Sequence, residues 1–285
     1  MNETNSNLQA ATYQAVRIGD IADWRLLASI SSYGIGAWLR HADPVQPLVT
    51  ALSCNWIDGK DENLLDCIEN AVYDHPQVLD DFSADIVVIA PRTVVVPTMI
   101  VADDEEKALS LYNKVYPAEG ADLMAEGVGD ATMLYSLTPG LYAFLQRTFP
   151  GARLHSHLAV LASRLCERSS DMPRLYIDIR CAGGEDSGIK KGEVDFVAFD
   201  RQTLLMCVTH QWHHPEDITY HLFNIMHVFG LDPSKTQVSL SGPVALKTTL
   251  VQQLRRDIAY VVMTMVPGIG AKANMPLAVS LLLRK

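Results

Sequence analysis

The sequence lacks the features that mark several classes of protein. Aromatic side chains make up only 7% of its 285 residues and charged side chains only 20%, whereas 48% are hydrophobic. Basic residues are in the minority, because 23 Lys and Arg stand against 33 Asp and Glu and give a formal charge of −10. Nucleic acids and anionic membrane surfaces are bound by a basic footprint, so neither is expected as a partner. The apolar content is ample for one large packed domain or two smaller ones.

Paired cysteines and long apolar segments are also missing. The five cysteines are dispersed without a C-x-x-C pair, which predicts reduced, buried thiols in a cytoplasmic protein. The longest apolar runs, 259–266 and 276–283, fall short of the roughly 20 residues that cross a bilayer, so no membrane insertion is expected. Residues 1–12 are polar and lack the basic and apolar regions of a secretory signal. We expect a soluble, cytoplasmic protein with a disordered tail over residues 1–20.

Alternating apolar segments and turn residues predict three strands early in the chain, at 26–30, 37–40 and 47–52. A helix is expected to begin at 61–63, where acidic residues suit its positive end, and it continues with apolar residues at helical spacing. The apolar run 86–90 is typical of a buried parallel strand.

The same order of elements returns in the second half. The segment 174–179 (RLYIDI) echoes 25–30 (RLLASI), and it is followed by predicted strands and one helix at 194–199, 204–208, 215–228 and 238–240. Strand–strand–strand–helix–strand therefore occurs twice, which indicates a duplicated architecture. A polar stretch ending in proline, 169–173, favours a boundary there. We predict a first domain at 21–171, with a small inserted hairpin, and a second domain at 172–285.

Several short motifs follow one another in order along the two halves. They are Pro91–Pro97, Tyr135–Pro139, Phe149-Pro150 with His155, Glu216–Leu222, and Leu231-Asp232-Pro233 leading to Leu240-Ser241-Gly242. In these motifs the chain resembles a bacterial family of uncharacterised proteins, domain of unknown function 3822, within the actin-like ATPase superfamily of actin, Hsp70-type chaperones and sugar kinases. The resemblance implies an α/β fold of duplicated actin-like (ribonuclease H-like) domains, each a mixed sheet flanked by helices.

The resemblance also implies where a nucleotide would bind. In an actin-like ATPase a hairpin at the start of each domain holds the phosphates through glycine N–H groups, and acidic residues order Mg²⁺ or the attacking water. The first hairpin carries Gly34 and Gly36, but serine stands at position 29 where an aspartate is implied. The second half has Asp178 at the matching strand position, and the adenosine-side loop keeps one glycine, Gly242.

Two functions follow from these residues. One is an ATP-binding enzyme or kinase with a divergent phosphate site, in which Gly34, Gly36, Asp178 and Gly242 bind ATP and Mg²⁺. The other is a degenerate, non-catalytic actin-like scaffold that binds a protein partner or self-associates, in which the glycines serve backbone packing alone. Because one metal-side carboxylate is missing and both phosphate turns depart from the pattern, we favour the scaffold and expect no catalytic residue.

The histidine-rich segment 210–214 is the remaining candidate for chemistry. Its histidines together with Asp217 include metal-ligating residue types, but no Cys/His framework accompanies them. We favour solvated histidines, with Asp217 at a helix N-terminus where negative charge is stabilised, and expect no metal site.

Overall fold

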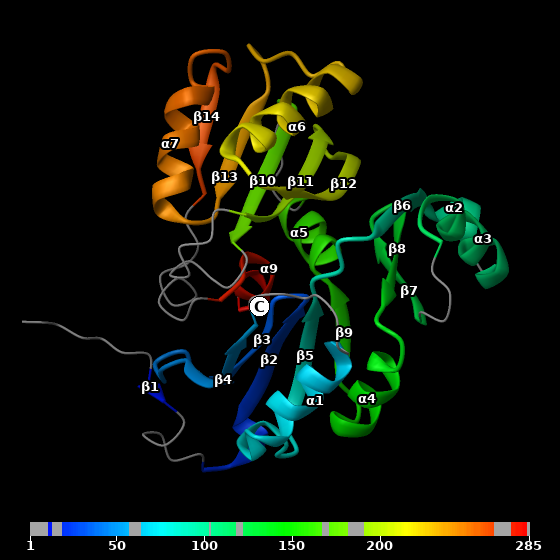
Figure 1. Ribbon diagram of the computed structural model, residues 1–285, viewed down its shortest axis with the longest axis vertical. Helices are drawn as coiled ribbons and strands as arrows, with labels where there is room; N and C mark the ends of the chain where they lie inside the picture. Colours follow the sequence, from blue (N-terminus) through cyan, green and yellow to red (C-terminus); the bar gives the residue numbers. More distant parts are fainter. Residues whose placement is uncertain are drawn as a thin grey trace, which may run out of the picture.

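The computed structural model describes residues 11–12, 19–56, 64–102, 104–117, 122–166, 171–181, 191–264 and 275–283. Two α/β halves lie one above the other along the longest axis of the molecule, and a small third sheet stands to one side (Figure 1). Residues 61–63 of the predicted first helix, residues 169–170 of the predicted boundary and most of the predicted tail lie outside the described residues.

The first sheet has six strands in the order β1-β4-β3-β2-β5-β9. β2, β3 and β4 are antiparallel neighbours, whereas β5 runs parallel to β2 and β9 runs parallel to β5. Helices α1 and α4 cover one face, and α5 and α9 cover the other (Figure 1). The elements are β1 (Ala11–Thr12), β2 (Trp24–Ser31), β3 (Gly34–His41), β4 (Val49–Asn55), β5 (Ser83–Val88), β9 (Arg153–Ser156), α1 (Leu64–Tyr73), α4 (Leu141–Thr148), α5 (His157–Cys166), α9 (Leu277–Leu282) and the 3-10 turns η2 (Ile21–Asp23) and η3 (Pro76–Val78).

Strand β1 lies within the segment that the sequence predicts to be a disordered tail. Ala11 and Thr12 pair in parallel with Val49 and Thr50 of β4. The outer edge of β4 offers backbone N–H and C=O groups that an added strand can use. A strand of two residues has no periodicity by which a sequence could predict it.

The second sheet has five strands in the order β12-β11-β10-β13-β14. Helices α6 and α7 pack on one of its faces. Apart from β1, this order matches the first sheet strand by strand, so the repeated element order is confirmed. The elements are β10 (Arg174–Cys181), β11 (Gly192–Asp200), β12 (Thr203–Trp212), β13 (Gln237–Ser241), β14 (Tyr260–Met263), α6 (Pro215–Val228) and α7 (Val244–Leu254).

The third sheet is small and has the order β6-β8-β7. β7 (Asp122–Val128) and β8 (Ala131–Leu137) form the predicted hairpin, and β6 (Thr93–Pro97) pairs with β8 as a third strand. The sequence pattern does not predict β6, because prolines bound its short Thr-Val-Val-Val run. Together with α2 (Thr98–Val101) and α3 (Glu105–Val115), the sheet buries a core of its own around Tyr112 and Leu134.

Helices α5 and α9 lie between the two larger sheets (Figure 1). They share one apolar core with Leu27 and Val87 of the first sheet and with Val197 and Phe199 of the second. Although α9 falls in the predicted second domain, it packs against α5 and β2 of the first half. The two halves are therefore joined by a continuous apolar core, and this core supports the polar residues described next.

Candidate functional site: a charged network between the halves

The predicted residue Asp178 lies on β10, on the face of the second sheet that turns away from α6 and α7. Its neighbours Ile177 and Ile179 belong to the apolar core beneath those helices, and successive side chains of a strand point to opposite faces. Asp178 pairs with Ser241 of β13, and the Ser241 hydroxyl donates a hydrogen bond to Asp178 Oδ1. Since Gly242 follows Ser241 directly, the structure brings two of the four predicted site residues together.

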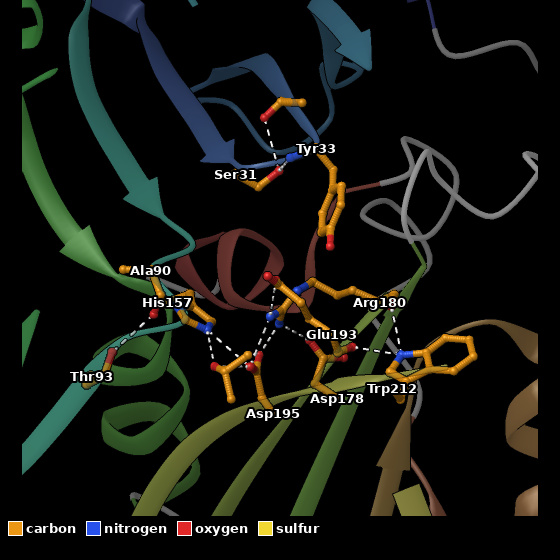
Figure 2. A network of polar contacts seen from close by, with 12 residues as sticks. Ser31, Tyr33, Ala90, Thr93, His157, Asp178, Arg180, Glu193, Asp195 and Trp212 are labelled. Atoms are coloured by element: carbon orange, nitrogen blue, oxygen red, sulfur yellow. Dashed lines mark hydrogen bonds and ion pairs between the residues drawn. The ribbon is translucent and has the colours of Figure 1, made fainter. Parts of the chain in front are cut away.

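Arg180, two residues further along β10, is surrounded by carboxylates (Figure 2). Its Nη2 donates to Asp195 Oδ1 at 3.0 Å and to Glu193 Oε2 at 3.2 Å, and its Nη1 donates to Asp195 Oδ2. Asp178 Oδ2 lies 3.8 Å from the same Nη1. Because Glu193 and Asp195 are only 2% and 1% exposed, one guanidinium provides the positive charge for three carboxylates that water barely reaches.

Asp195 has two further partners, and one of them comes from the other half of the molecule. The Thr209 hydroxyl of β12 donates to Asp195 Oδ1 at 2.7 Å. His157, the first residue of α5, places Nε2 at 3.2 Å from the same oxygen and is itself buried. The network therefore ties the second sheet to the helix that lies between the sheets.

Burial and charge act against each other on these groups. Burial raises the pKa of Asp178 to about 6, and the nearby Asp195 charge adds to this, although Arg180 and the Ser241 hydroxyl pull it down. Burial also opposes ionisation of Asp195, but Arg180 and then His157 outweigh it and hold the pKa of Asp195 well below its ordinary value. Burial would lower the pKa of Arg180, yet the carboxylates, Asp195 foremost, keep it above the ordinary value. Arg180 is therefore a permanent cation.

The turn between β2 and β3 faces this network from the first half. Figure 2 shows the Tyr33 side chain extending from the turn toward Arg180. The Ser31 hydroxyl is used within the turn, where it donates to the Gly34 carbonyl at 3.1 Å and accepts from the Tyr33 N–H at 3.2 Å. The predicted first hairpin thus lies opposite Asp178 (Figure 2).

The three predicted glycines are all required by close packing. A Cβ on Gly34 would lie 2.6 Å from the Cys54 carbonyl oxygen, and a Cβ on Gly36 would lie 2.5 Å from the Trp38 ring. Gly242 has a φ of +124°, and its Cβ would lie 2.6 Å from the carbonyl oxygen of Ile179. Side chains are excluded at each position by neighbouring protein atoms. Binding of ATP by these glycines and Asp178 stays a prediction.

Glu193, Asp195 and His157 belong to this network, and the sequence pattern does not predict them as candidate site residues. A signal was nevertheless present, because β11 carries two carboxylates inside an otherwise apolar run (EVDFVAF). A carboxylate in a buried strand needs a cationic partner, and residues 193 and 195 point to the same face. The sequence pattern does not show that this cationic partner is Arg180, which lies on the neighbouring strand β10.

The histidine-rich segment forms no metal site in the described part of the chain. His210 and His221 instead stack with parallel rings 4.0 Å apart, and burial lowers the pKa of both. Asp217 accepts the backbone N–H groups of His213 and His214, each at 2.9 Å, which lowers its pKa. The predicted role of Asp217 at the helix N-terminus is confirmed.

A second charged cluster lies in the first half, at the edge next to the small sheet. Asp85 of β5 is fully buried and pairs with Arg25 of β2 and with Arg153 Nε of β9 at 2.9 Å. His155 lies between Asp85, at 3.4 Å, and Glu126 of β7, at 3.0 Å. This cluster joins the small sheet to β9, and in it cations and carboxylates are balanced.

Comparison with known proteins places these observations in a family. The model of a family of proteins of unknown function, DUF3822, matches residues 56–261, well over half of the chain. The chain belongs to this family. The comparison with curated proteins gave no match.

Solved structures define the fold of this family member. A Bacteroides thetaiotaomicron protein, described as having an actin-like ATPase fold and unknown function, is 17% identical with a TM-score of 0.76, covering 94% of this chain and 100% of its own. The PilM-PilN type IV pilus biogenesis complex contains a chain that is 14% identical with a TM-score of 0.52, covering 93% and 99%. The family member described here therefore has the actin-like ATPase fold, as predicted. In the described residues no helix combines the length and apolar character needed to cross a membrane.

Proposed function

We propose that this protein is a non-catalytic actin-like scaffold that binds a protein partner and does not hydrolyse ATP. The observation that carries this proposal is the guanidinium of Arg180, which occupies the centre of the carboxylate group formed by Asp178, Glu193 and Asp195. The protein supplies its own permanent cation where the resemblance implies a metal ion and phosphates.

The contacts of Arg180 use the oxygen atoms that a metal ion would need. Mg²⁺ is held by carboxylate oxygens, water and substrate phosphates in a near-octahedral arrangement. Both oxygens of Asp195 and one oxygen of Glu193 already accept N–H groups of Arg180. A second cation beside a guanidinium would also experience like-charge repulsion at low dielectric. These features favour a closed, metal-free network.

The first half supports the same proposal. Ser29 is buried and uncharged at the position where the resemblance implies a carboxylate. The backbone of β4 and the ring of Trp38 leave no room for a side chain at the two glycines of the hairpin, so packing explains these glycines without a bound phosphate. Among the described residues, the first hairpin therefore supplies no carboxylate, and Arg180 already uses the oxygens of Asp195 that could order Mg²⁺ or an attacking water in this superfamily.

A protein partner is supported by the similarity to a pilus assembly protein. The related chain of the PilM-PilN complex is, by its description, part of a type IV pilus biogenesis complex. A cytoplasmic location is supported by the cysteines, since none of the five forms a disulfide and unbridged thiols suit a reducing compartment.

One observation favours the alternative, an ATP-binding enzyme. Asp178, whose pKa is raised to about 6, lies beside Ser241 and the left-handed Gly242 at the carboxyl end of β13. Strongly perturbed pKa values are concentrated at functional sites. The alternative therefore centres on Asp178.

Ligand-induced stabilisation distinguishes the two functions. Thermal unfolding and calorimetric titration of the full chain with millimolar Mg-ATP should show no change, whereas a ligand at 100 times its Kd adds about 2.7 kcal/mol to stability. Asp178→Ala and the exposed Asp200→Ala form a matched pair of variants. Stabilisation of the natural protein by Mg-ATP that Asp178→Ala removes and Asp200→Ala keeps would establish the enzyme and exclude the scaffold proposed here.

A further inference from the structure

Strand β14 is the outermost strand of the second sheet. It runs parallel to β13, and among the described residues no strand pairs with its other side. Figure 1 shows it at the outer edge of the upper half, beside α7. Free strand edges are templates for pairing with another chain, and proteins commonly protect them with charges, prolines or covering segments.

The backbone of β14 presents hydrogen-bonding groups outward at Val261 and Met263. The Thr264 N–H donates to the Leu240 carbonyl of β13 at 2.7 Å, and alternate residues of a strand bond to the same neighbour. Val262 and Thr264 therefore face β13, and Val261 and Met263 face away from it. An independent contact agrees, because Arg255 Nη2 donates to the Val261 carbonyl at 3.2 Å from outside the sheet.

The side chains along this edge are apolar and exposed. Tyr260, Val262 and Met263 are 50%, 40% and 46% exposed, and the segment 258–264 contains no charged residue. β9, the strand at the equivalent position of the first sheet, instead carries Arg153 and His155. β9 thus carries charged side chains of its own, whereas β14 carries none and is covered at the Val261 carbonyl by the guanidinium of Arg255.

We infer that β14 pairs with β14 of a second copy of this chain, antiparallel and about a twofold axis at Val262. This inference rests on the proposed scaffold function and names one partner of that scaffold. In this register Val261 of one copy lies opposite Met263 of the other, and their outward N–H and C=O groups form two reciprocal hydrogen-bonded pairs. Val262 then faces Val262 of the second copy in a non-hydrogen-bonded pair, where side chains approach most closely.

The segment is complementary to a second copy of itself. Each chain carries a net charge of −10, which opposes most contacts between two copies. Pairing of the uncharged segment 258–264 adds no like-charge contact within the strand once Arg255 has left the Val261 carbonyl, whereas self-pairing of β9 would bring cationic side chains together. The two sheets would join into one, and the exposed side chains of Tyr260 and Val262 would be partly buried.

Arg255 regulates access to this edge. Its guanidinium donates a hydrogen bond to the Val261 carbonyl. The second copy needs the same carbonyl as an acceptor, so this bond must break before the strands pair. Arg255→Ala is therefore expected to tighten the dimer several-fold, because no competing donor remains at that carbonyl.

Analytical ultracentrifugation over a concentration series tests the dimer directly. The natural protein should change from monomer to dimer as concentration rises. Met263→Pro removes one outward N–H per chain without touching the bonds to β13, and it should raise the dimer Kd roughly tenfold or more. Val228→Lys, a change at an exposed apolar position of α6, serves as the control and should leave the Kd unchanged.

Disulfide trapping tests the register. Val262→Cys should crosslink two chains on mild oxidation, since paired Cβ atoms lie about 4.5–5.5 Å apart. Tyr260→Cys, on the same face, should not, because the two copies of residue 260 are roughly 13 Å apart along the strands. The natural chain, with its five free cysteines, gives the background.

A protein that stays monomeric at every concentration would overturn the inference, as would a dimer that Met263→Pro does not weaken or that Tyr260→Cys traps as well as Val262→Cys. A strand of another protein bound at β14 of a monomeric chain would also overturn it while leaving the scaffold function intact. Mg-ATP binding would overturn the scaffold function without affecting the dimer measurement, so the two failures are distinguishable.

Discussion

The two larger sheets have the same strand order, apart from β1, but four equivalent positions carry uncharged residues in the first sheet and charged side chains in the second. In the first half, Ser29 pairs with Gly36 and Ser31 pairs with Gly34 across β2 and β3. In the second half, Asp178 pairs with Asp195 and Arg180 pairs with Glu193 across β10 and β11. Small uncharged residues thus occupy the positions that hold all four charges of the network in the other half.

Because of this difference, the space beside the equivalent strands is occupied by a different kind of side chain in each half. Over Gly36 in the first half lies the ring of Trp38, part of the apolar core between the sheets. In the second half the guanidinium of Arg180 fills the corresponding space among the carboxylates (Figure 2). One duplicated framework can therefore close its site either with apolar packing or with an internal ion network, and this protein uses one solution in each half.

Removing the cation should have the largest effect. Arg180→Met keeps much of the side-chain volume but leaves three buried carboxylates without their partner, and breaking such a network costs about 3–5 kcal/mol. Urea denaturation measures the loss. Arg147→Met is the matched control, since Arg147 is 68% exposed and lies 3.7 Å from Glu69, and its loss should stay below about 0.5 kcal/mol.

A smaller residue at position 180 tests whether the carboxylates can bind a metal ion once the guanidinium is gone. Arg180→Ala leaves space as well as free carboxylate oxygens, so millimolar Mg²⁺ should stabilise this variant and not the natural protein. Equal stability of Arg180→Met and the natural protein would show that the guanidinium is not needed to balance the carboxylates.

Placing a carboxylate in the first half should have the next largest effect. Ser29→Asp creates the acidic residue that the second half has, but it does so in a buried position where Ser31, and not an arginine, stands two residues further along the strand. We expect a loss of about 2–4 kcal/mol near neutral pH, because an unpaired buried charge is costly. Ser29→Ala, measured in the same denaturation series, separates the charge from the loss of the hydroxyl. A variant as stable as Ser29→Ala would mean that the first half tolerates charge as the second does.

Asp178 should make stability depend on pH. Its pKa is about 6 in the folded protein, above the 3.8 of an ordinary aspartate, so the folded state binds the proton more tightly. The contribution is full below pH about 4 and is lost as pH rises through about 6, which amounts to about 3 kcal/mol. Asp178→Asn removes this dependence.

The free energy of unfolding of the natural protein and of Asp178→Asn, measured at several pH values, gives the difference between them. The variant should gain relative to the natural protein as pH rises from about 4 to about 7. A difference that stays constant with pH would contradict the raised pKa of Asp178.

The hydroxyl of Thr209 should have the smallest effect. Thr209→Val removes the hydrogen bond to Asp195 and keeps the shape of the side chain, which should cost about 1 kcal/mol. Thr203→Val, at the exposed start of the same strand, should change stability by less than about 0.5 kcal/mol. Equal effects of the two changes would indicate that Arg180 and His157 satisfy Asp195 without the Thr209 hydroxyl.

Many of the helices and strands could be predicted from the sequence, because buried elements carry apolar residues in runs or at a characteristic spacing. The apolar runs of β5 and β10 and the spacing of apolar residues in α6 depend on residues close in the chain. The repeated order of these elements predicted the duplicated fold. The pairing of β1 with β4 and the third strand of the small sheet did not appear, since both depend on partners distant in sequence.

By itself the sequence determined the element order, the family and the position of Asp178, because helices, strands and short motifs are encoded by neighbouring residues. Only the tertiary structure decided what surrounds that carboxylate. It brought Arg180, Glu193, Asp195, Thr209 and His157 together from three strands and the helix between the sheets. The physical reason is that a buried charge is stabilised by whatever lies within a few ångströms of it, and such proximity is a property of sheet register and packing rather than of sequence spacing.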